Sequence, residues 1–296
     1  MQKKITPMQN LSPSLSEARQ HYNHDLADKF YKHVWAGDDI FIGLGWHDDD
    51  NKPQTIAIAC QRMVDNMVEL ISNHQPGNTR LLDLGAGYGA TARYLARQYG
   101  FHVDCLNLSE TQNAENRRLN HEHGLNDKIR VVQGNFETLE FCNEIYHVVW
   151  SQDAFLHSDN RSAILSEIDR VLQHGGEVIF SDILQSEVCP HHALLKPVLA
   201  RFGLSNLATQ SFYHEQAIQL GWQVHEMQDI SSHLVKHYWR VIHEIDSGYD
   251  DLLQTFESDY LAKVRQGMAN WIEAGEQGYL KWGLFHFGKT IMKGKL

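Results

Sequence analysis

The chain lacks the features that would place it in a membrane. None of its 296 residues belongs to an apolar run near the roughly 20 residues that a membrane-spanning helix needs. No charged, apolar and small-residue leader is seen at its start. Its four cysteines are too widely separated for a disulfide framework or a zinc site. These absences predict a protein that works in the cytoplasm and does not enter a membrane.

Dense basic clusters are also missing. The formal net charge is -11 at pH 7, and the only adjacent basic pairs are Lys3–Lys4 and Arg117–Arg118. A nucleic-acid backbone attracts concentrated positive charge, so we expect a small-molecule partner and no nucleic acid. Although 19 histidines are present, no three potential metal ligands share a recognisable spacing. Because surface and capping roles explain scattered histidines as well, we expect no metal site.

Apolar stretches of strand length alternate with helical patterns over residues 80–184. This alternation predicts a parallel sheet with helices on both faces. We expect strands at 80–84, 101–107, 129–133, 146–151, 177–184, 221–230 and 283–292. Helices are expected at 56–70, at 89–99, from 109 onward and at 162–172. A short helical stretch near 191–205 and a long helical insertion over 232–274 follow. Pro76–Gly77 and Gly175–Gly176 are expected to end the helices before them.

The segment LLDLGAGYGATARYLA, residues 81–96, places three glycines between a strand and a helix. Gly85, Gly87 and Gly89 allow a sharp turn and the close approach of a ligand, although a tight turn alone would also explain them. Asp83 lies two residues before the first glycine, where its carboxylate would repel a phosphate and favour a positively charged ligand. The combination D-x-G-x-G-x-G resembles motif I of class I S-adenosylmethionine-dependent methyltransferases.

This resemblance implies an α/β fold with a Rossmann-like methyltransferase sheet that is mostly parallel and has an antiparallel last strand. It also implies a helical cap at 1–75 over a core at 76–296, with substrate-shaping insertions at about 185–215 and 232–278. The implied cofactor is S-adenosyl-L-methionine, whose sulfonium and ammonium suit the acidic turn. The residues at the family's cofactor-binding positions are Asp83, Gly85, Ala86, Gly87, Asn107, Leu108, Gln112, Asn135, Phe136, Ser151 and Gln152.

Asn107 departs from the family pattern at the end of the second strand. The family usually has an acidic residue there that binds both ribose hydroxyls, and an amide hydrogen-bonds a hydroxyl more weakly than a carboxylate does. The segment from Ser109 to Gln112 has capping-box spacing. Gln112 therefore either faces the cofactor, as the resemblance implies, or only caps a helix.

Four further segments extend the resemblance to nearly the whole chain. HYNHDLADKFYKHVWAGDDIFIGLGW, WSQDAFLHS, HYWRV and KWGLFHFGK resemble the sarcosine and dimethylglycine N-methyltransferases of glycine betaine synthesis. A weaker resemblance to phosphoethanolamine methyltransferases implies that an N-terminal tyrosine and a histidine after the fourth strand close the site. Those positions correspond to Tyr22 and His157, with Asp153 one helical turn earlier, and we expect all three to be catalytic.

Amine methylation asks for further groups beside the cofactor. An alkylamine holds its proton to about pH 10 and has no lone pair while protonated, so His157 or Asp153 would accept that proton, directly or through water. Aromatic faces stabilise the ammonium that develops. The aromatic candidates are Tyr22, Tyr31, Trp35, Trp46, Phe155 and Trp239. The substrate carboxylate needs a cation, for which Arg201 is included in the candidate site and Lys196 and Arg240 stay open as alternatives.

Other interpretations of the same residues stay open. The N-terminal aromatic residues would also serve as core residues, His157 as the cap of a helix beginning near Ser158, and Asp153 as a partner of the glycine-turn backbone. The acceptor could instead be phosphoethanolamine, a prenylated ring, a sugar or a sterol. The chain could also bind the cofactor without catalysis, although such a module would not need Tyr22, Asp153 and His157. The sequence does not decide between a monomer and a homodimer.

Overall fold

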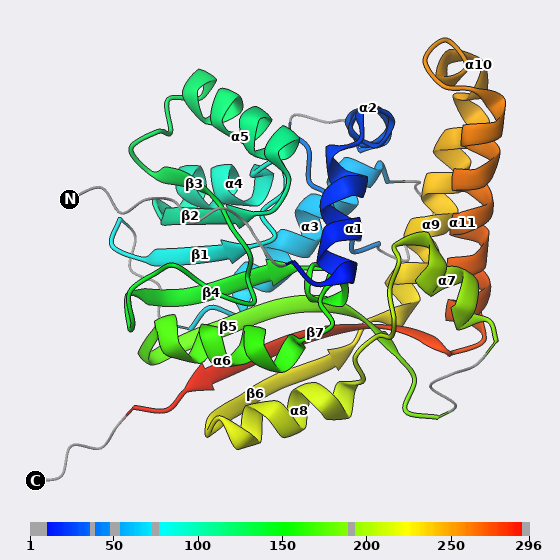
Figure 1. Cartoon of the computed structure of the whole chain (residues 1–296). Coiled ribbons are helices and arrows are strands. Elements are labelled where there is room, and N and C mark those ends of the chain that lie inside the picture. The colour runs from blue at the N-terminus through cyan, green and yellow to red at the C-terminus, as the bar shows by residue number, and fades with distance from the viewer. Residues whose placement is uncertain (1–10, 36–38, 48–53, 73–76, 189–192, 292–296) are drawn as a thin grey trace, which may run out of the picture.

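A computed structural model describes residues 11–35, 39–47, 54–72, 77–188 and 193–291. Its centre is a seven-stranded sheet in the order β3-β2-β1-β4-β5-β7-β6 (Figure 1). Strands β1 to β5 pair in parallel, whereas β7 runs antiparallel to both of its neighbours. The strands are β1 (Arg80–Leu84), β2 (His102–Asn107), β3 (Ile129–Gln133), β4 (Tyr146–Gln152), β5 (Leu172–Gln185), β6 (Trp222–Asp229) and β7 (Leu280–Lys289). The predicted sheet, including its antiparallel last strand, is confirmed.

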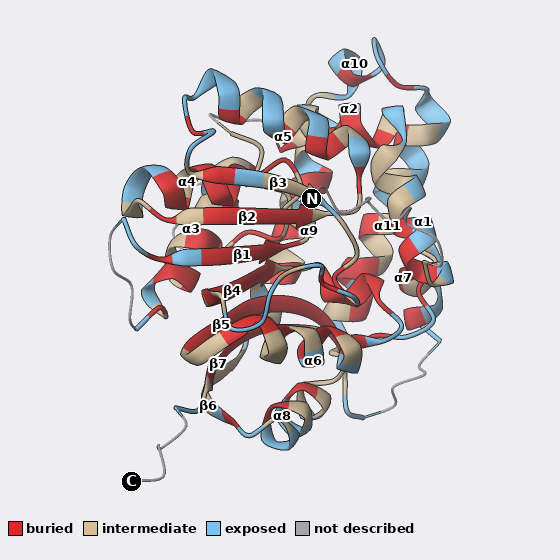
Figure 2. Cartoon of the chain, turned by 60° about the vertical axis from the view of Figure 1, so that its left-hand side comes forward, coloured by how far each residue is buried: buried red, intermediate tan, exposed pale blue. Residues whose placement is uncertain are grey.

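Helices cover both faces of this sheet, and the middle strands are buried along most of their length (Figure 2). Helices α3, α4, α9 and α11 pack on the face that carries Leu81 and Ile179, whereas α6 and α8 pack on the face that carries Leu82 and Phe180. The helices are α1 (Pro13–Asn23), α2 (Asp25–Val34), α3 (Ile56–Glu69), α4 (Ala90–Tyr99), α5 (Glu110–Glu122), η1 (Phe155–His157), α6 (Arg161–Val171), α7 (Leu195–Arg201), α8 (Gln210–Gln219), α9 (Ser231–Ser247), α10 (Tyr249–Leu252) and α11 (Ser258–Glu276). Within the described ranges, no helix has both the length and the apolar character needed to cross a membrane.

The N-terminal helices are attached to the rest of the chain by two kinds of contact. An apolar cluster that includes Phe30 of α2, Ile245 of α9 and Met268 of α11 joins these three helices. The hydroxyl of Ser109, which caps α5, also lies 2.8 Å from Oδ1 of Asn23 at the end of α1. Apolar burial therefore fixes α2 on one side, and a polar contact fixes α1 beside the cofactor-binding core.

Two expected helix ends were wrong, and the expected helical insertion consists of several helices. The helical insertion over 232–274 is not continuous, because Gly248 ends α9 and a turn separates α10 from α11. Helix α3 ends at Glu69, well before Gly77; Pro76 lies outside the described residues. Gly175 and Gly176 lie inside β5, where a Cβ on Gly176 would stand 2.9 Å from the His147 carbonyl oxygen. The backbone of β4 thus approaches too closely for a side chain at position 176, which explains why this residue is a glycine.

Arg93 of α4 is fully buried and holds the segment that follows α2. Its guanidinium donates two hydrogen bonds of 2.6 Å to the carboxylate of Asp39. It also donates to the side chains of Asn116 and Asn120 on α5 and to the carbonyl oxygen of Tyr88. A buried charge needs such complete pairing, so Arg93 fastens residues 39–47 to α4 and α5.

We expect Arg93→Met to lower the free energy of unfolding by about 3 to 5 kcal/mol, because it leaves the Asp39 carboxylate largely buried without its main partner. Urea unfolding followed by circular dichroism measures this difference. Arg265→Met is the matched control, since it breaks an exposed pair with Asp246 and should cost less than about 1 kcal/mol. Equal losses in the two variants would contradict the role given to Arg93.

Candidate functional site

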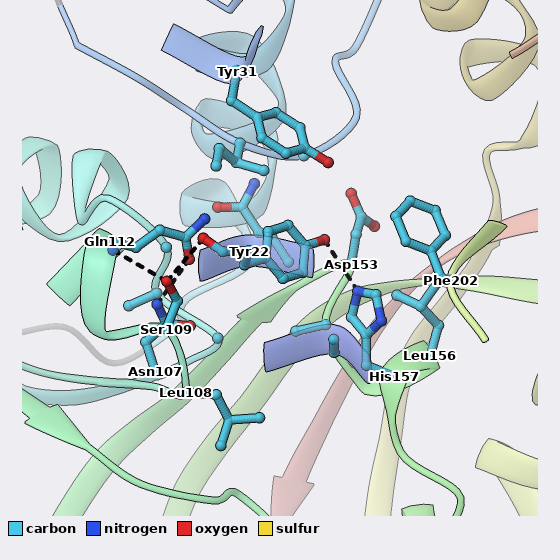
Figure 3. A pocket seen from close by; sticks show the side chains of 18 of the residues that line it. Tyr22, Tyr31, Asn107, Leu108, Ser109, Gln112, Asp153, Leu156, His157 and Phe202 are labelled. Carbon is cyan, nitrogen blue, oxygen red and sulfur yellow. Dashed lines mark hydrogen bonds between the residues drawn. The ribbon is translucent and has the colours of Figure 1, made fainter. Parts of the chain in front are cut away.

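A cavity lies at the carboxyl ends of β1, β2 and β4 (Figure 3). Ligands of open α/β sheets bind at this edge. One side of the cavity is formed by the glycine turn and the strand ends, and the other by side chains of α1, α2, α7, α9 and α11. The N-terminal helices and the late insertions thus meet the core around this cavity.

The three glycines of the turn serve different purposes, although all have positive φ. A Cβ on Gly85 would lie 2.4 Å from the Cβ of Ala154, and one on Gly89 would lie 2.1 Å from Oδ1 of Asn116. Close packing therefore explains why Gly85 and Gly89 have no side chain. A Cβ on Gly87 would meet only Ile42, at 4.0 Å, because Gly87 faces the cavity. The open backbone at Gly87 fits the close approach of an adenosyl cofactor.

Asp83 contributes an acidic group to the same end of the cavity. It is 3% exposed at the end of β1, and burial raises the pKa of its carboxyl group to about 7. A cationic ligand would favour the ionised carboxylate and lower this pKa again. The residue therefore fits a cofactor that carries a sulfonium and an ammonium.

Asn107 and Gln112 lie together at the end of β2, and both line the cavity. The Nδ2 group of Asn107 donates to Oε1 of Gln112 at 2.9 Å (Figure 3). The backbone N–H of Gln112 also donates to the Ser109 hydroxyl, which is the predicted helix cap. Gln112 therefore takes part in both the helix cap and the cavity wall, because its backbone N–H binds Ser109 while its side chain lines the cavity.

The remaining cofactor candidates divide into two groups. Ala86, Leu108, Phe136 and Gln152 line the cavity, as do Gly85 and Gly87. Asn135 and Ser151 do not. The side chain of Asn135 accepts a hydrogen bond from the N–H of Glu137, and the hydroxyl of Ser151 donates to the carbonyl oxygen of Leu84. These side-chain atoms stabilise a turn and the strand pair β1–β4, and contact of either residue with the cofactor stays a prediction.

Tyr22 and His157 meet in the cavity as expected. The hydroxyl of Tyr22 lies 3.1 Å from Nε2 of His157 (Figure 3). His157 does not cap α6, because the side chain of Asn160 does so. Burial, with smaller contributions from the charges of His21 and Arg161, lowers the pKa of His157 to about 3. The imidazole is therefore neutral at physiological pH.

The predicted aromatic residues are only partly brought together. Tyr31 and Trp35 line the cavity beside Tyr22, with ring centroids of Tyr22 and Tyr31 5.9 Å apart. Trp46, Phe155 and Trp239 do not line it, and their placement corrects the prediction. Trp46 stacks on His233, Phe155 packs between Phe136 and Phe180, and Trp239 is 52% exposed on α9.

Four aromatic residues of the cavity wall were missed by the sequence reasoning. They are Phe41, Phe202, Tyr238 and Trp271. Tyr238 had a usable signal, because it follows Leu234 by four residues and precedes Val241 by three, on the buried side of α9. Its neighbour Trp239 points to solvent for the same reason. Helical periodicity would thus have selected Tyr238 in place of Trp239.

The structure distinguishes the three candidate cations. Arg201, at the end of α7, lines the cavity. Lys196 is exposed on the same helix, and Arg240 forms an ion pair with Glu244. Gly267 of α11 gives Arg201 its space, since a Cβ there would lie 2.6 Å from Nη1 of the guanidinium. A cation is therefore present at the aromatic side of the cavity.

Asp153 lines the cavity, but its carboxylate is occupied by three hydrogen bonds. Oδ2 accepts from the N–H of Leu44 at 2.9 Å, and Oδ1 accepts from the hydroxyl of Ser181 at 2.8 Å and the indole N–H of Trp282 at 2.7 Å. Its partners are thus the 39–47 segment, β5 and β7, and they include no backbone group of the glycine turn. Burial raises the pKa of Asp153, and the hydrogen bonds oppose this rise.

The glycine turn, the acidic residue before it and the cavity at the strand ends define a class I S-adenosylmethionine-dependent methyltransferase. A family model described as a methyltransferase domain matches residues 82–180. A sarcosine/dimethylglycine N-methyltransferase from Aphanothece halophytica is 44% identical over 92% of this chain and 96% of its own length. One from Halorhodospira halochloris is 40% identical over 93% and 97%. The chain belongs to the family of sarcosine/dimethylglycine N-methyltransferases.

A solved structure agrees with this membership. A proposed sarcosine dimethylglycine methyltransferase from Galdieria sulphuraria superposes with a TM-score of 0.82 at 31% identity, covering 90% of this chain and 99% of its own. The chain is therefore an S-adenosylmethionine-dependent N-methyltransferase, as the glycine turn and the four further segments of the sequence predict.

We expect Gly87→Ala to weaken cofactor binding by 10-fold or more, because the added methyl group enters the cavity. Isothermal titration calorimetry with S-adenosylhomocysteine measures the affinity. Gly77→Ala is the matched control: its φ is also positive, +78°, and nothing lies within 4 Å of the added Cβ. Gly77→Ala should have the backbone strain of an alanine at positive φ but bind the cofactor as tightly as the unchanged chain. An equal loss of affinity in both variants would mean that backbone strain, and not the filled cavity, weakens binding.

Cofactor affinity should also depend on pH through Asp83. Its pKa of about 7 means that the carboxyl group of the free protein becomes protonated as the pH falls below 7. Since a cationic ligand binds the carboxylate form, we expect affinity to fall by up to about tenfold per pH unit below that point. Calorimetry over the range from about pH 5.5 to 8.5 tests this. Asp83→Asn should bind weakly at every pH; a variant with the same pH profile as the unchanged chain would contradict the assignment.

Proposed function

We propose that the enzyme methylates sarcosine, dimethylglycine or both at nitrogen and thereby forms glycine betaine. The relatives named for these substrates align with more than nine tenths of the chain. The observation that carries the proposal is the composition of the cavity, in which an arginine and a cluster of tyrosines and tryptophans face the cofactor turn. Such a site suits a small molecule with a carboxylate and a methylated amine.

Arg201 is the proposed partner of the substrate carboxylate. Arg19 also lines the cavity, but it pairs with Glu110. Among the described residues, no carboxylate lies at ion-pair distance from Arg201. Its planar guanidinium can hold a carboxylate through two hydrogen bonds, which would fix the orientation of the amine at the other end of the substrate.

Methyl transfer is an in-line displacement that depends mainly on positioning. When bound, S-adenosyl-L-methionine supplies an electrophilic methyl group on a sulfonium. The aromatic side chains of Tyr22, Tyr31 and Trp35 would surround the amine nitrogen and stabilise the positive charge that it gains, at about 0.5 to 2 kcal/mol for each desolvated contact. Residues 1–75 then act as a cap, and the insertions at about 185–215 and 232–278 supply the rest of the substrate wall.

The proton of the amine is the remaining requirement. The burial that lowers the pKa of His157 also disfavours a protonated amine beside it, so the cavity favours the neutral form of the substrate. Neutral His157 and Tyr22 can accept a hydrogen bond from the amine and so orient its lone pair. Asp153 is better placed for a positioning role, since its oxygens already accept three hydrogen bonds.

Mass spectrometry of purified protein incubated with S-adenosylmethionine tests the function directly. The amine panel is glycine, sarcosine, dimethylglycine, phosphoethanolamine and ethanolamine. We expect betaine from sarcosine or dimethylglycine and little product from the phosphorylated amine. Product from phosphoethanolamine alone would replace the proposed acceptor. Cofactor binding with no product from any of the five amines would contradict the substrate assignment.

Arg201→Met should raise the KM for sarcosine or dimethylglycine by about 10- to 100-fold, because a hydrogen bond to a charged group contributes about 1.5 to 3 kcal/mol. Turnover at saturation should change less, since the group binds the end of the substrate that does not react. Arg201→Lys should restore part of the affinity. Lys196→Met removes an exposed cation from the same helix and serves as the control; an equal rise in its KM would mean a general effect of charge.

Tyr22→Phe and His157→Ala should each lower turnover by about 10²-fold or more if the pair positions the amine or moves its proton. Trp239→Phe, which changes an exposed aromatic residue outside the cavity, should keep the activity of the unchanged enzyme. Steady-state kinetics with the cofactor saturating separates this effect from loss of cofactor binding. Rates close to the unchanged enzyme in both Tyr22→Phe and His157→Ala would contradict the role of the pair.

A further inference from the structure

Three side chains that can bind metal meet on neighbouring strands away from the cofactor cavity. They are Glu177 on β5, His225 on β6 and His286 on β7. One potential ligand atom from each lies within 4.8 Å of the other two, and Nε2 of His286 is 3.3 Å from Oε1 of Glu177. Metal–ligand distances of about 2.0 to 2.2 Å place neighbouring donor atoms about 3 to 4 Å apart. The three ligand atoms are therefore already close to the separations that a bound ion requires.

The local backbone brings His225 to the other two ligands. The pairing of β6 with β7 shifts between Val224 and Glu226, so His225 is the extra residue of a β-bulge. Its ring centroid lies 4.6 Å from that of His286. Gly288 supplies the space for this position, since a Cβ there would lie 2.4 Å from Nε2 of His225. The bulge and Gly288 together place the imidazole of His225 beside the other two side chains, a position that regular strand pairing would not give it.

Hydrogen bonds hold the Glu177 carboxylate in place. Nε2 of His286 lies 3.3 Å from its Oε1 atom. The backbone N–H of Ser72 lies 3.1 Å from Oε2 and 3.3 Å from Oε1 of Glu177 and so orients the carboxylate.

We propose that Glu177, His225 and His286 bind one divalent transition-metal ion, with Zn²⁺ as the first candidate. Two imidazoles and one carboxylate suit Zn²⁺ and its neighbours in the first transition row better than Mg²⁺ or Ca²⁺. His225 is exposed, so its ring can rotate by the small amount that closure on an ion needs, and water can complete the coordination. The expectation of no metal site rested on sequence spacing, which does not show ligands that meet only through the sheet.

The place of the site in the sheet points to a structural role. Glu177 lies in the first half of β5, whereas β5 reaches the cofactor cavity with Ile183, near its carboxyl end. A bound ion would join three adjacent strands and, through Ser72, the segment that follows α3. We therefore expect metal binding to stabilise the fold without taking part in methyl transfer.

Isothermal titration of untagged, chelator-treated protein with Zn²⁺ is the test, with thermal unfolding as a second measurement. We expect about one tight site per chain and a rise in Tm on binding. His225→Ala and Glu177→Gln should each lower the affinity at least 10-fold. Gly288→Ala keeps all three ligands but displaces the His225 ring, so it should also weaken binding. Methyl-transfer rates confirm that the variants are folded.

His214→Ala is the matched control, because it removes an exposed histidine on α8 that is outside the cluster. It should bind Zn²⁺ as the unchanged chain does. Full affinity and stoichiometry in both His225→Ala and Glu177→Gln would overturn the proposal. An equal loss in His214→Ala would overturn it as well, because Zn²⁺ would then bind the histidine-rich surface in general.

Discussion

The arrangement of the cavity depends on the buried carboxylate of Asp153. This residue follows β4 with a φ of +50° and accepts hydrogen bonds from Leu44, Ser181 and Trp282. A carboxylate in an apolar interior is unfavourable unless such donors surround it. The requirement for donors therefore joins the segment over the cavity to two strands of the sheet. The Arg93–Asp39 pair fixes the beginning of that same segment from the side of α4.

The enclosure that results also sets the chemistry of the site. Burial lowers the pKa of His157 to about 3 and raises the pKa of Tyr22 well above its ordinary value, so both groups are neutral over the physiological range. A cavity that disfavours charge on these groups favours a neutral amine with an available lone pair. In the proposed reaction, aromatic faces then stabilise the positive charge that the nitrogen gains. Burial of Tyr22 and His157 thus supports both the selection of a neutral amine and the stabilisation of the charge that it gains.

The sequence was a good guide where function needs particular local chemistry. The alternation of strands and helices, the glycine turn with Asp83, the Ser109 cap and the meeting of Tyr22 with His157 are all present. The sequence did not show which aromatic residues line the cavity and which belong to the core, because this depends on which side of each helix or strand faces the sheet. Phe155 is buried in the core for this reason, whereas Tyr238, on the buried side of α9, lines the cavity.

Pairings between distant segments were also outside the reach of the sequence. Arg93 and Asp39 have no motif, and the bulge that re-aims His225 appears only when β6 pairs with β7. Such contacts follow from tertiary packing and not from spacing along the chain.

The central claim is that Arg201 and the aromatic cluster hold one small amino acid with its nitrogen toward the glycine turn. A crystal structure of the ternary complex with S-adenosylhomocysteine and dimethylglycine tests it most directly. We predict the substrate carboxylate within hydrogen-bond distance of Arg201 and the dimethylamino group among Tyr22, Tyr31 and Trp35. A carboxylate bound elsewhere, with the nitrogen turned away from the cofactor sulfur, would contradict it.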